Sequence, residues 1–204
     1  MMSRPRILSV GGRAPDPAAL AEATAILRRG GLVAFPTETV YGLGADATNP
    51  QAIEQLNRVK GRPPEKPYSL HLHTPEQAEA YVKAIPPVAA KLIARFWPGP
   101  LTIVMPAKDG TTVGFRLPDH PVARAFLKAC EVPVVAPSAN RSGAAPPTDA
   151  NEVVAALDGD VECILDGGPT RYGKESTVVE VTPQGRLEIR REGAITRATI
   201  VAAL

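Results

Sequence analysis

Apolar residues recur along this chain at two spacings, which together predict helices alternating with short strands. Spacings of three and four residues predict helices over residues 17–29, 50–60, 74–83, 87–96, 121–130 and 148–157. Short apolar or alternating runs predict strands over residues 32–35, 69–73, 101–105, 111–116, 132–137, 163–166, 176–181 and 187–190. Since helices are interspersed with single strands and with a hairpin at 101–116, we expect an α/β fold of the α+β type with a mixed sheet.

Several helix boundaries carry specific signals. Asp16 before Pro17 is typical of a helix start, and Gly30-Gly31 is typical of a helix end. Thr74 and Gln77 have the spacing of a capping box, which predicts that the third helix begins there.

Composition favours one domain. The 204 residues, 44% of them hydrophobic, can form one substantial core, and no linker or repeat interrupts them, so we expect a single domain over residues 1–204. Neither a signal sequence nor a membrane-spanning apolar run is present, which predicts a cytoplasmic protein with no membrane association. Cys130 and Cys163 lack a metal-ligand or CxxC spacing, so we expect buried thiols in a reducing compartment.

Two polar segments suggest a ligand site, although the net charge of +2 is too small to indicate a nucleic-acid protein by itself. The segment PTETVYGLG follows an apolar run, so we interpret it as a loop that offers the hydroxyls of Thr37 and Thr39. The segment KGRPPEKP follows a helix and adds the positive charges of Lys60, Arg62 and Lys66. Hydroxyls facing fixed positive charge favour an anionic, polar small molecule such as a phosphate ester.

Other polar residues allow two interpretations each. Ser138 and Asn140 follow a strand directly, where ligands bind in open α/β sheets, but such residues also form ordinary turns. Arg116 at a strand end suits a carboxylate or phosphate clamp, and it is equally typical of a surface arginine. His71 is more often a structural histidine than an acid or base. The residues alone leave these alternatives open.

Seven blocks in order resemble one family. They are PTETVYGLG, KGRPPEKP, FWPGPLTIVM, VGFRLPDHP, APSANRSGAAPPT, DGG and KESTVVEV, and they span about residues 30–193. Each is similar to the corresponding block of the Sua5/YrdC family of threonylcarbamoyl-AMP synthases. The resemblance implies a YrdC/RibB-like domain with core motifs over about residues 17–195, an open twisted mixed sheet flanked by helices, and a concave basic cleft.

The resemblance also implies a reaction. L-threonine, bicarbonate and ATP, with Mg²⁺, would give L-threonylcarbamoyladenylate and pyrophosphate, the first step of the t6A37 modification of tRNA. This makes the chain a nucleotidyltransferase whose expected partners are the proteins of the t6A transferase complex, with tRNA or double-stranded RNA as a further candidate. Because the chain ends near Leu204, we expect the short type without a C-terminal Sua5 domain, in which hand-off of the intermediate depends on direct contact or diffusion.

The resemblance assigns site residues by position. It implies that L-threonine is bound by Thr39, His71, Arg116, Ala136 and Ser176. It implies that ATP is bound by Lys60, Arg62, Lys66, Thr112, Ser138, Asn140, Pro146 and Arg191, with Arg190 as a substitute for the last. Lys60 and Arg62 are expected to be catalytic because they would stabilise phosphate charge, and no protein side chain is expected to bind metal.

Two other functions compete with this one. An RNA-binding module would use the same basic cleft for a nucleic-acid backbone without catalysis, and Lys60→Ala would then weaken RNA retention instead of abolishing turnover. A carbamoyltransferase domain of the hydrogenase-maturation type is disfavoured because the chain lacks acylphosphatase-like and zinc-finger segments.

Overall fold

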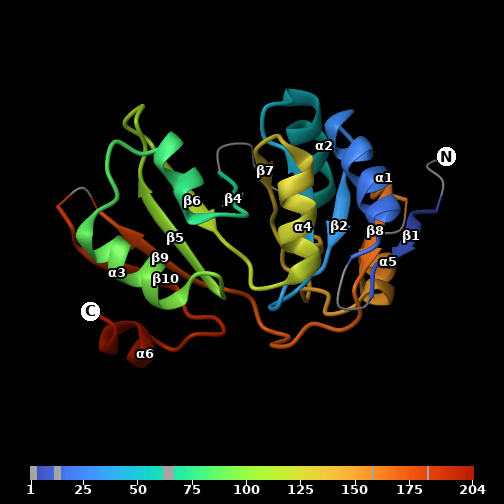
Figure 1. The fold of residues 1–204 in the computed structure, drawn as a ribbon. Coiled ribbons are helices and arrows are strands. Elements are labelled where there is room, and N and C mark those ends of the chain that lie inside the picture. The colour runs from blue at the N-terminus through green and yellow to red at the C-terminus, as the bar shows by residue number, and fades with distance from the viewer. Residues whose placement is uncertain (1–3, 12–14, 62–66, 158, 183) are drawn as a thin grey trace.

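The computed structural model describes residues 4–11, 15–61, 67–157, 159–182 and 184–204. Within them, a ten-stranded sheet has the order β1-β8-β2-β3-β7-β4-β6-β5-β9-β10 (Figure 1). The strands are β1 (Arg6–Ser9), β2 (Val33–Phe35), β3 (Gly42–Asp46), β4 (Leu70–His71), β5 (Leu101–Pro106), β6 (Thr112–Arg116), β7 (Val134–Val135), β8 (Cys163–Asp166), β9 (Thr177–Val181) and β10 (Leu187–Arg191). Parallel pairs such as β5–β9 and antiparallel pairs such as β5–β6 coexist, so the predicted mixed sheet and the hairpin are confirmed.

Helices flank the sheet on both faces. They are α1 (Pro17–Arg28), α2 (Pro50–Lys60), α3 (Pro87–Phe96), α4 (Pro121–Cys130), α5 (Ala150–Leu157), α6 (Arg197–Ala202) and the 3₁₀ helix η1 (Pro75–Ala80). Figure 1 shows α1 and α4 side by side on one face, and Arg28 of α1 donates from Nε to the carbonyl of Cys130 at 2.8 Å. None of the helices described is long and apolar enough to cross a bilayer.

Local sequence signals explain where the helices begin and end. Asp16 accepts from the backbone N–H of Ala18 at 3.0 Å and caps α1. Helix α2 ends at Lys60 because Gly61 adopts the left-handed conformation (φ 59°, ψ 38°), which glycine tolerates without a Cβ clash. This ending matters for function because it fixes the place of Lys60.

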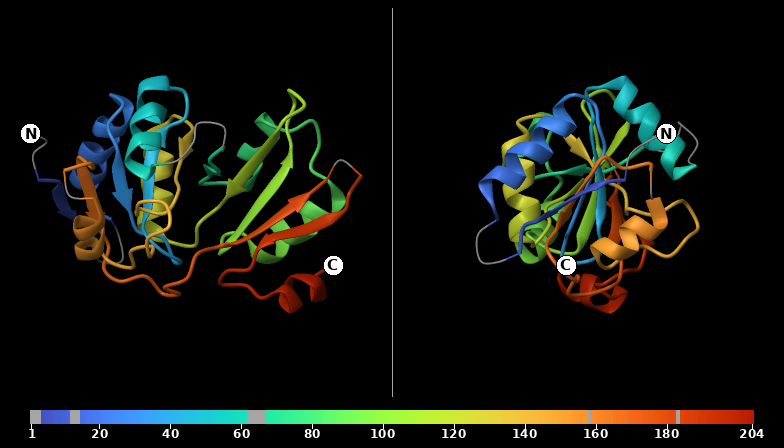
Figure 2. Two further views of the ribbon diagram at one scale, coloured as in Figure 1. Left: turned by 180° about the vertical axis from the view of Figure 1, so that it is seen from behind. Right: turned by 90° about the vertical axis from the view of Figure 1, so that its right-hand side faces the viewer.

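The middle of the sheet is its thinnest part. Strands β4 and β7 have two residues each, and they pair antiparallel with Leu70 opposite Val135. They connect a half built on β1, β8, β2 and β3 with a half built on β6, β5, β9 and β10. The loop over residues 167–176 crosses between the two halves, as the view from behind in Figure 2 shows. A site therefore forms where the halves meet.

Some predicted elements need correction. The predicted helix over 74–83 is the short 3₁₀ helix η1, although its capping box between Thr74 and Gln77 is confirmed. The predicted strand over 132–137 is reduced to β7. Strands β1 and β3 and helix α6 were not predicted. We interpreted the whole PTETVYGLG segment as a loop, but its last three residues begin β3 because β2 and β7 pair with it on both sides.

Apolar packing follows the two faces of the sheet. One cluster contains Leu56, Phe115 and Ile164, and a second contains Leu27, Phe35 and Phe126. Cys130 and Cys163 are buried free thiols, as expected, and burial raises the pKa of each to about 12.

Candidate functional site

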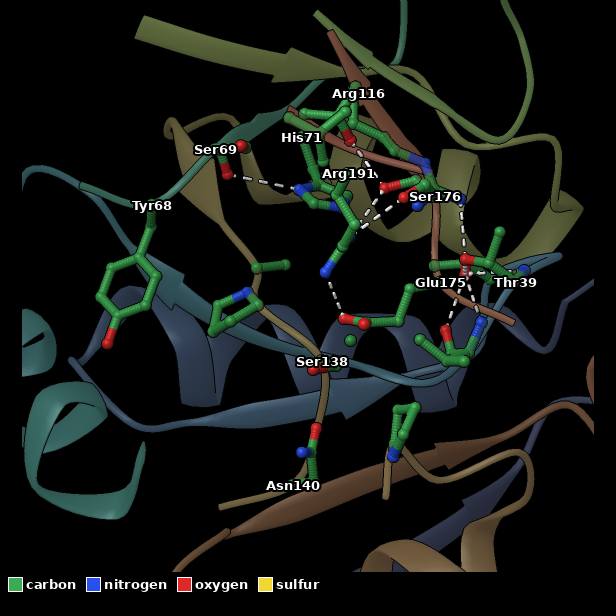
Figure 3. Close-up of a pocket in the computed structure, with 18 of the residues that line it drawn as sticks. Thr39, Tyr68, Ser69, His71, Arg116, Ser138, Asn140, Glu175, Ser176 and Arg191 are labelled. Carbon is green, nitrogen blue, oxygen red and sulfur yellow. Dashed lines mark hydrogen bonds and ion pairs between the residues drawn. The ribbon is translucent and has the colours of Figure 1, made fainter. Parts of the chain in front are cut away.

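A cavity of about 610 Å³ lies where the two halves of the sheet meet (Figure 3). Its walls come from the loop after β2, the end of α2, and the strands β4, β5, β6 and β9 with the loop after β7. Strand ends at such a junction are the usual location of ligands in open α/β sheets. The cavity is therefore the candidate active site.

A buried guanidinium lies in the wall of the cavity. Arg116, the last residue of β6, is 5% exposed and donates from Nη2 to Thr39 Oγ1 at 2.8 Å and to Glu38 Oε1 at 2.9 Å. Thr39 is in turn 2.8 Å from the hydroxyl of Thr37, which donates to the carbonyl of Val40 at 2.7 Å. The loop after β2 thus holds Arg116 in a fixed orientation, which suits recognition of a carboxylate or phosphate.

A second polar group lies at the start of β9. The hydroxyls of Ser176 and Thr102 are 2.8 Å apart, and both side chains are buried. Arg191 donates from Nη2 to the Ser176 carbonyl at 3.0 Å, and its Nη1 forms an ion pair with Glu175 at 2.8 Å. Figure 3 shows Glu175, Ser176 and Arg191 gathered around this part of the cavity.

Lys60 bonds to backbone carbonyls of the loop after β7. Its Nζ donates to the Ser138 carbonyl at 2.6 Å and makes a shorter bond to the Asn140 carbonyl, and the side chain is only 4% exposed. The Asn140 amide donates to the carbonyls of Arg141 at 2.9 Å and Ala144 at 2.7 Å. Both side chains therefore shape the loop that faces the cavity, and the charge of Lys60 stays in the cavity wall.

His71 is held neutral. Burial, and next the nearby guanidinium of Arg116, lower the pKa of His71 to about 3. Its Nδ1 lies 3.4 Å from the Ser69 carbonyl. A neutral imidazole can offer a hydrogen bond at this position without adding charge to the cavity.

Most residues expected in the site meet here. The cavity is lined by ten of them: Thr39, Lys60, His71, Arg116, Ala136, Ser138, Asn140, Pro146, Ser176 and Arg191. Thr112 lies at the far end of β6 and is not in this lining. Arg62 and Lys66 fall outside the described residues, so the basic character of the cleft stays a prediction, as do the individual binding roles. Arg190 also lines the cavity but pairs with Glu180 at 2.8 Å.

Sequence reasoning missed several residues of the site. Glu38, Thr102 and Glu175 contact the predicted residues directly, and Tyr68 lines the cavity while its hydroxyl donates to Asn57 at 2.8 Å. For Glu38 a signal was present, because a carboxylate stood between two threonines beside a fully apolar strand. Such an acid needs a partner when it is buried.

The described residues contain no cluster of three or more His, Cys, Asp or Glu side chains that could enclose a metal ion. Among the residues that the structure describes, the acid in the cavity lining is Glu175, which is paired with Arg191. A cation held mainly by the phosphates of a nucleotide fits this wall, because Mg²⁺ commonly binds that way with few protein ligands.

Comparison with known proteins identifies the family. Residues 25–193 match the Sua5/YciO/YrdC family model, which carries the description "Telomere recombination". The chain belongs to this family. It is similar to the threonylcarbamoyl-AMP synthase of Pyrococcus abyssi, with 46% identity over 169 residues, covering 78% of this chain and 50% of the relative. It is also similar to that of Bacillus subtilis, with 42% identity over 195 residues, covering 91% and 56%.

A solved family structure has the same fold. The crystal structure of P. abyssi Sua5 complexed with L-threonine superposes with a TM-score of 0.91 at 40% identity, covering 97% of this chain and 60% of that one. The open mixed sheet flanked by helices is thus the fold of the Sua5/YciO/YrdC family. The chain spans about half the length of the two curated relatives.

Proposed function

We propose that this member of the Sua5/YciO/YrdC family is a threonylcarbamoyl-AMP synthase. It forms L-threonylcarbamoyladenylate and pyrophosphate from L-threonine, bicarbonate and ATP. The observation that carries the proposal is a single cavity in which a buried, oriented guanidinium, Arg116, lies opposite a loop shaped by the buried ammonium of Lys60. The names of the P. abyssi and B. subtilis relatives support the same activity.

The amino-acid subsite is centred on Arg116. Its guanidinium binds the carboxylate of L-threonine, and Thr39 keeps it in place. Neutral His71 and the hydroxyl of Ser176 offer hydrogen bonds without charge, and Ala136 leaves room for a small side chain. The L-threonine complex of P. abyssi Sua5, at 40% identity, supports a threonine ligand in this fold.

The nucleotide subsite lies along the loop after β7. Ser138, Asn140 and the backbone at Pro146 face the cavity there, and Arg191 contributes charge from the other side. Lys60 acts by fixing the loop and by keeping positive charge in the wall, which favours phosphate. The phosphates of ATP would carry Mg²⁺, which would neutralise part of their charge.

The chemistry requires positioning more than acid–base groups. The neutral amine of L-threonine takes up the carbon of bicarbonate with release of water and becomes a carbamate. A carbamate oxygen then attacks the α-phosphorus of ATP as pyrophosphate leaves. Arg116 and the loop after β7 hold the two reactants together, which removes most of the entropic barrier to this nucleotidyl transfer. The product then passes to the proteins of the t6A transferase complex and finally to tRNA, and we expect this reaction in the cytoplasm.

The test is pyrophosphate release from ATP with bicarbonate and Mg²⁺, with and without L-threonine, followed by mass spectrometry of the nucleotide product. We expect release that depends on L-threonine and a product with the mass of L-threonylcarbamoyladenylate. Folded protein that releases no pyrophosphate but retains RNA would instead favour the RNA-binding module.

A further inference from the structure

The last carbonyls of α2 accept hydrogen bonds from the loop after β7. A helix leaves its final carbonyls without partners inside the helix, so other segments must supply donors. The carbonyl of Lys60 accepts from the backbone N–H of Ser142 at 3.0 Å, and the carbonyl of Val59 accepts from Arg141 Nη1 at 3.3 Å. The loop that carries the nucleotide subsite is therefore attached to the end of α2.

The Arg141 side chain makes its contacts outside the cavity. Its Nη2 forms an ion pair with Asp160, which follows α5, and the two side chains are 56% and 29% exposed. Asn140 and residues 142–144 line the cavity, whereas Arg141 and Asp160 are not part of that lining. Loss of the Arg141 side chain therefore removes no group that faces a ligand, and it changes only how the loop is held.

The loop depends on such contacts because it packs little. Residues 141–145 are exposed, and a turn over residues 141–144 is closed by the Ala144 N–H, which donates to the Arg141 carbonyl at 3.0 Å. The amide of Asn140 donates to the same two residues' carbonyls, so a shift of this turn also shifts Asn140. Arg141 anchors the turn from outside, as the Lys60 ammonium does from the cavity wall.

We propose that Arg141 is a positioning residue for the nucleotide, because it holds this turn against α2 in the arrangement that binds ATP. The inference rests on the proposed function, in which the loop after β7 binds ATP. The groups proposed to bind L-threonine are held by other segments, Arg116 by Thr39 and Ser176 by Thr102. Loss of the Arg141 side chain should therefore weaken the binding of ATP and leave that of L-threonine unchanged.

Charge alone offers a competing explanation, because Arg141→Met removes a cation and any anion would then bind less well. Asp160→Ala separates the two explanations. If only charge mattered, removal of this acid would strengthen the binding of ATP. If Asp160 holds the guanidinium of Arg141 in place, the same substitution weakens the binding of ATP.

Arg28 provides a matched control at the end of a different helix. It donates to the carbonyls of Cys130 at 2.8 Å and Ala129 at 3.1 Å in α4, and it forms an ion pair with Glu131. Its side chain is 44% exposed and is not part of the cavity lining. Arg28→Met therefore reports what the loss of an arginine that caps a helix end does to the fold and to binding.

The experiment measures the Kd for radiolabelled ATP with Mg²⁺, and separately the Kd for radiolabelled L-threonine, by equilibrium dialysis on the full chain. We expect Arg141→Met to raise the Kd for ATP by about three- to ten-fold and to change that for L-threonine by less than about two-fold. We expect Asp160→Ala to raise the Kd for ATP by about two- to five-fold. The double variant should bind ATP no more weakly than Arg141→Met, and Arg28→Met should bind both ligands as wild type does.

Several results would overturn the inference. An unchanged or lower Kd for ATP in folded Asp160→Ala contradicts the anchoring role, and so does an Arg141→Met protein that loses L-threonine as much as ATP. Additive losses in the double variant also contradict it, because additivity indicates residues that act independently. Wild-type protein that binds no ATP overturns the proposed function itself, which the other results leave standing.

Discussion

The hydroxyls of Thr102 and Ser176 lie 2.8 Å apart in the wall of the cavity, and both side chains are buried. Strand β5 carries Thr102, and its parallel neighbour β9 begins directly after Ser176. The pairing of these two strands therefore sets where the Ser176 hydroxyl points. A substrate that forms a hydrogen bond with the Ser176 hydroxyl therefore meets a group whose orientation the fold has already fixed.

Ser176→Ala tests that hydroxyl. The change leaves the buried Thr102 hydroxyl without this partner, so we expect a loss of about 1–3 kcal/mol in the free energy of unfolding. The KM for L-threonine should rise more than the KM for ATP. The double variant Thr102→Val/Ser176→Ala removes both groups and should recover most of the stability but not the KM, as urea unfolding and steady-state kinetics will show. If the double variant recovered both the stability and the wild-type KM for L-threonine, the substrate would not contact Ser176.

Lys60→Met tests whether the loop after β7 depends on a buried ammonium. The variant leaves the carbonyls of Ser138 and Asn140 without their donor, so we expect kcat/KM to fall by about 100-fold or more. We also expect unfolding to become easier by about 1–3 kcal/mol. Arg58→Met is the control, because Arg58 is exposed in the same last turn of α2. Equal effects of the two variants would contradict a special role for Lys60.

The histidine beside Arg116 predicts a pH dependence of stability. The folded protein lowers the pKa of His71 from 6.5 to about 3. Between these values the unfolded chain binds the proton and the folded protein does not, so stability falls as pH decreases through that window. The contribution of one such group is at most about 1.4 kcal/mol per pH unit.

Urea unfolding across the same window measures this slope. His71→Asn should make the free energy of unfolding depend less steeply on pH in this window. His73→Asn should change it less, because burial lowers the pKa of His73 at a more accessible position. A slope that is identical in wild type and His71→Asn would show that His71 is not held neutral by the fold.

Local signals were sufficient to predict much of this fold, whereas contacts between distant residues were not. Asp16 and Gly61 mark the ends of α1 and α2 because caps act within a few residues. The buried partner of Arg116 was missed because Glu38 is 78 positions away in the chain. Lys60 was expected to contact phosphate directly, and only the fold shows it bonding to the carbonyl of Asn140, 80 positions away.

Gly193 is predicted to be essential for the geometry of the second polar group. A Cβ at this position would overlap the carbonyl of Glu175 and the backbone of Ser176. Gly193→Ala must therefore displace that backbone, at a cost of about 1–3 kcal/mol. The control Gly11→Ala meets open space. We expect thermal unfolding to occur at a lower temperature and the KM for L-threonine to rise in the first variant alone, and an unaffected KM would place Ser176 outside the substrate contacts.

The ion pair between Glu175 and Arg191 predicts competition with ATP. The two side chains are 34% and 43% exposed and 2.8 Å apart, and Glu175 presents its charge to the cavity where phosphate would bind. Glu175→Gln removes the repulsion of phosphate and releases Arg191. Since partly exposed pairs contribute up to about 1 kcal/mol, we expect the KM for ATP to fall by about two- to five-fold.

Glu188→Gln provides the matched control for this change. Glu188 pairs with Arg190 at 3.0 Å on the same strand but is not part of the cavity lining. Its replacement should leave the KM for ATP unchanged at low salt, where charge effects are largest. If Glu175→Gln instead raises the KM for ATP, the acid acts by holding Arg191 in its binding orientation. The positive charge would then matter less than the direction in which the guanidinium points.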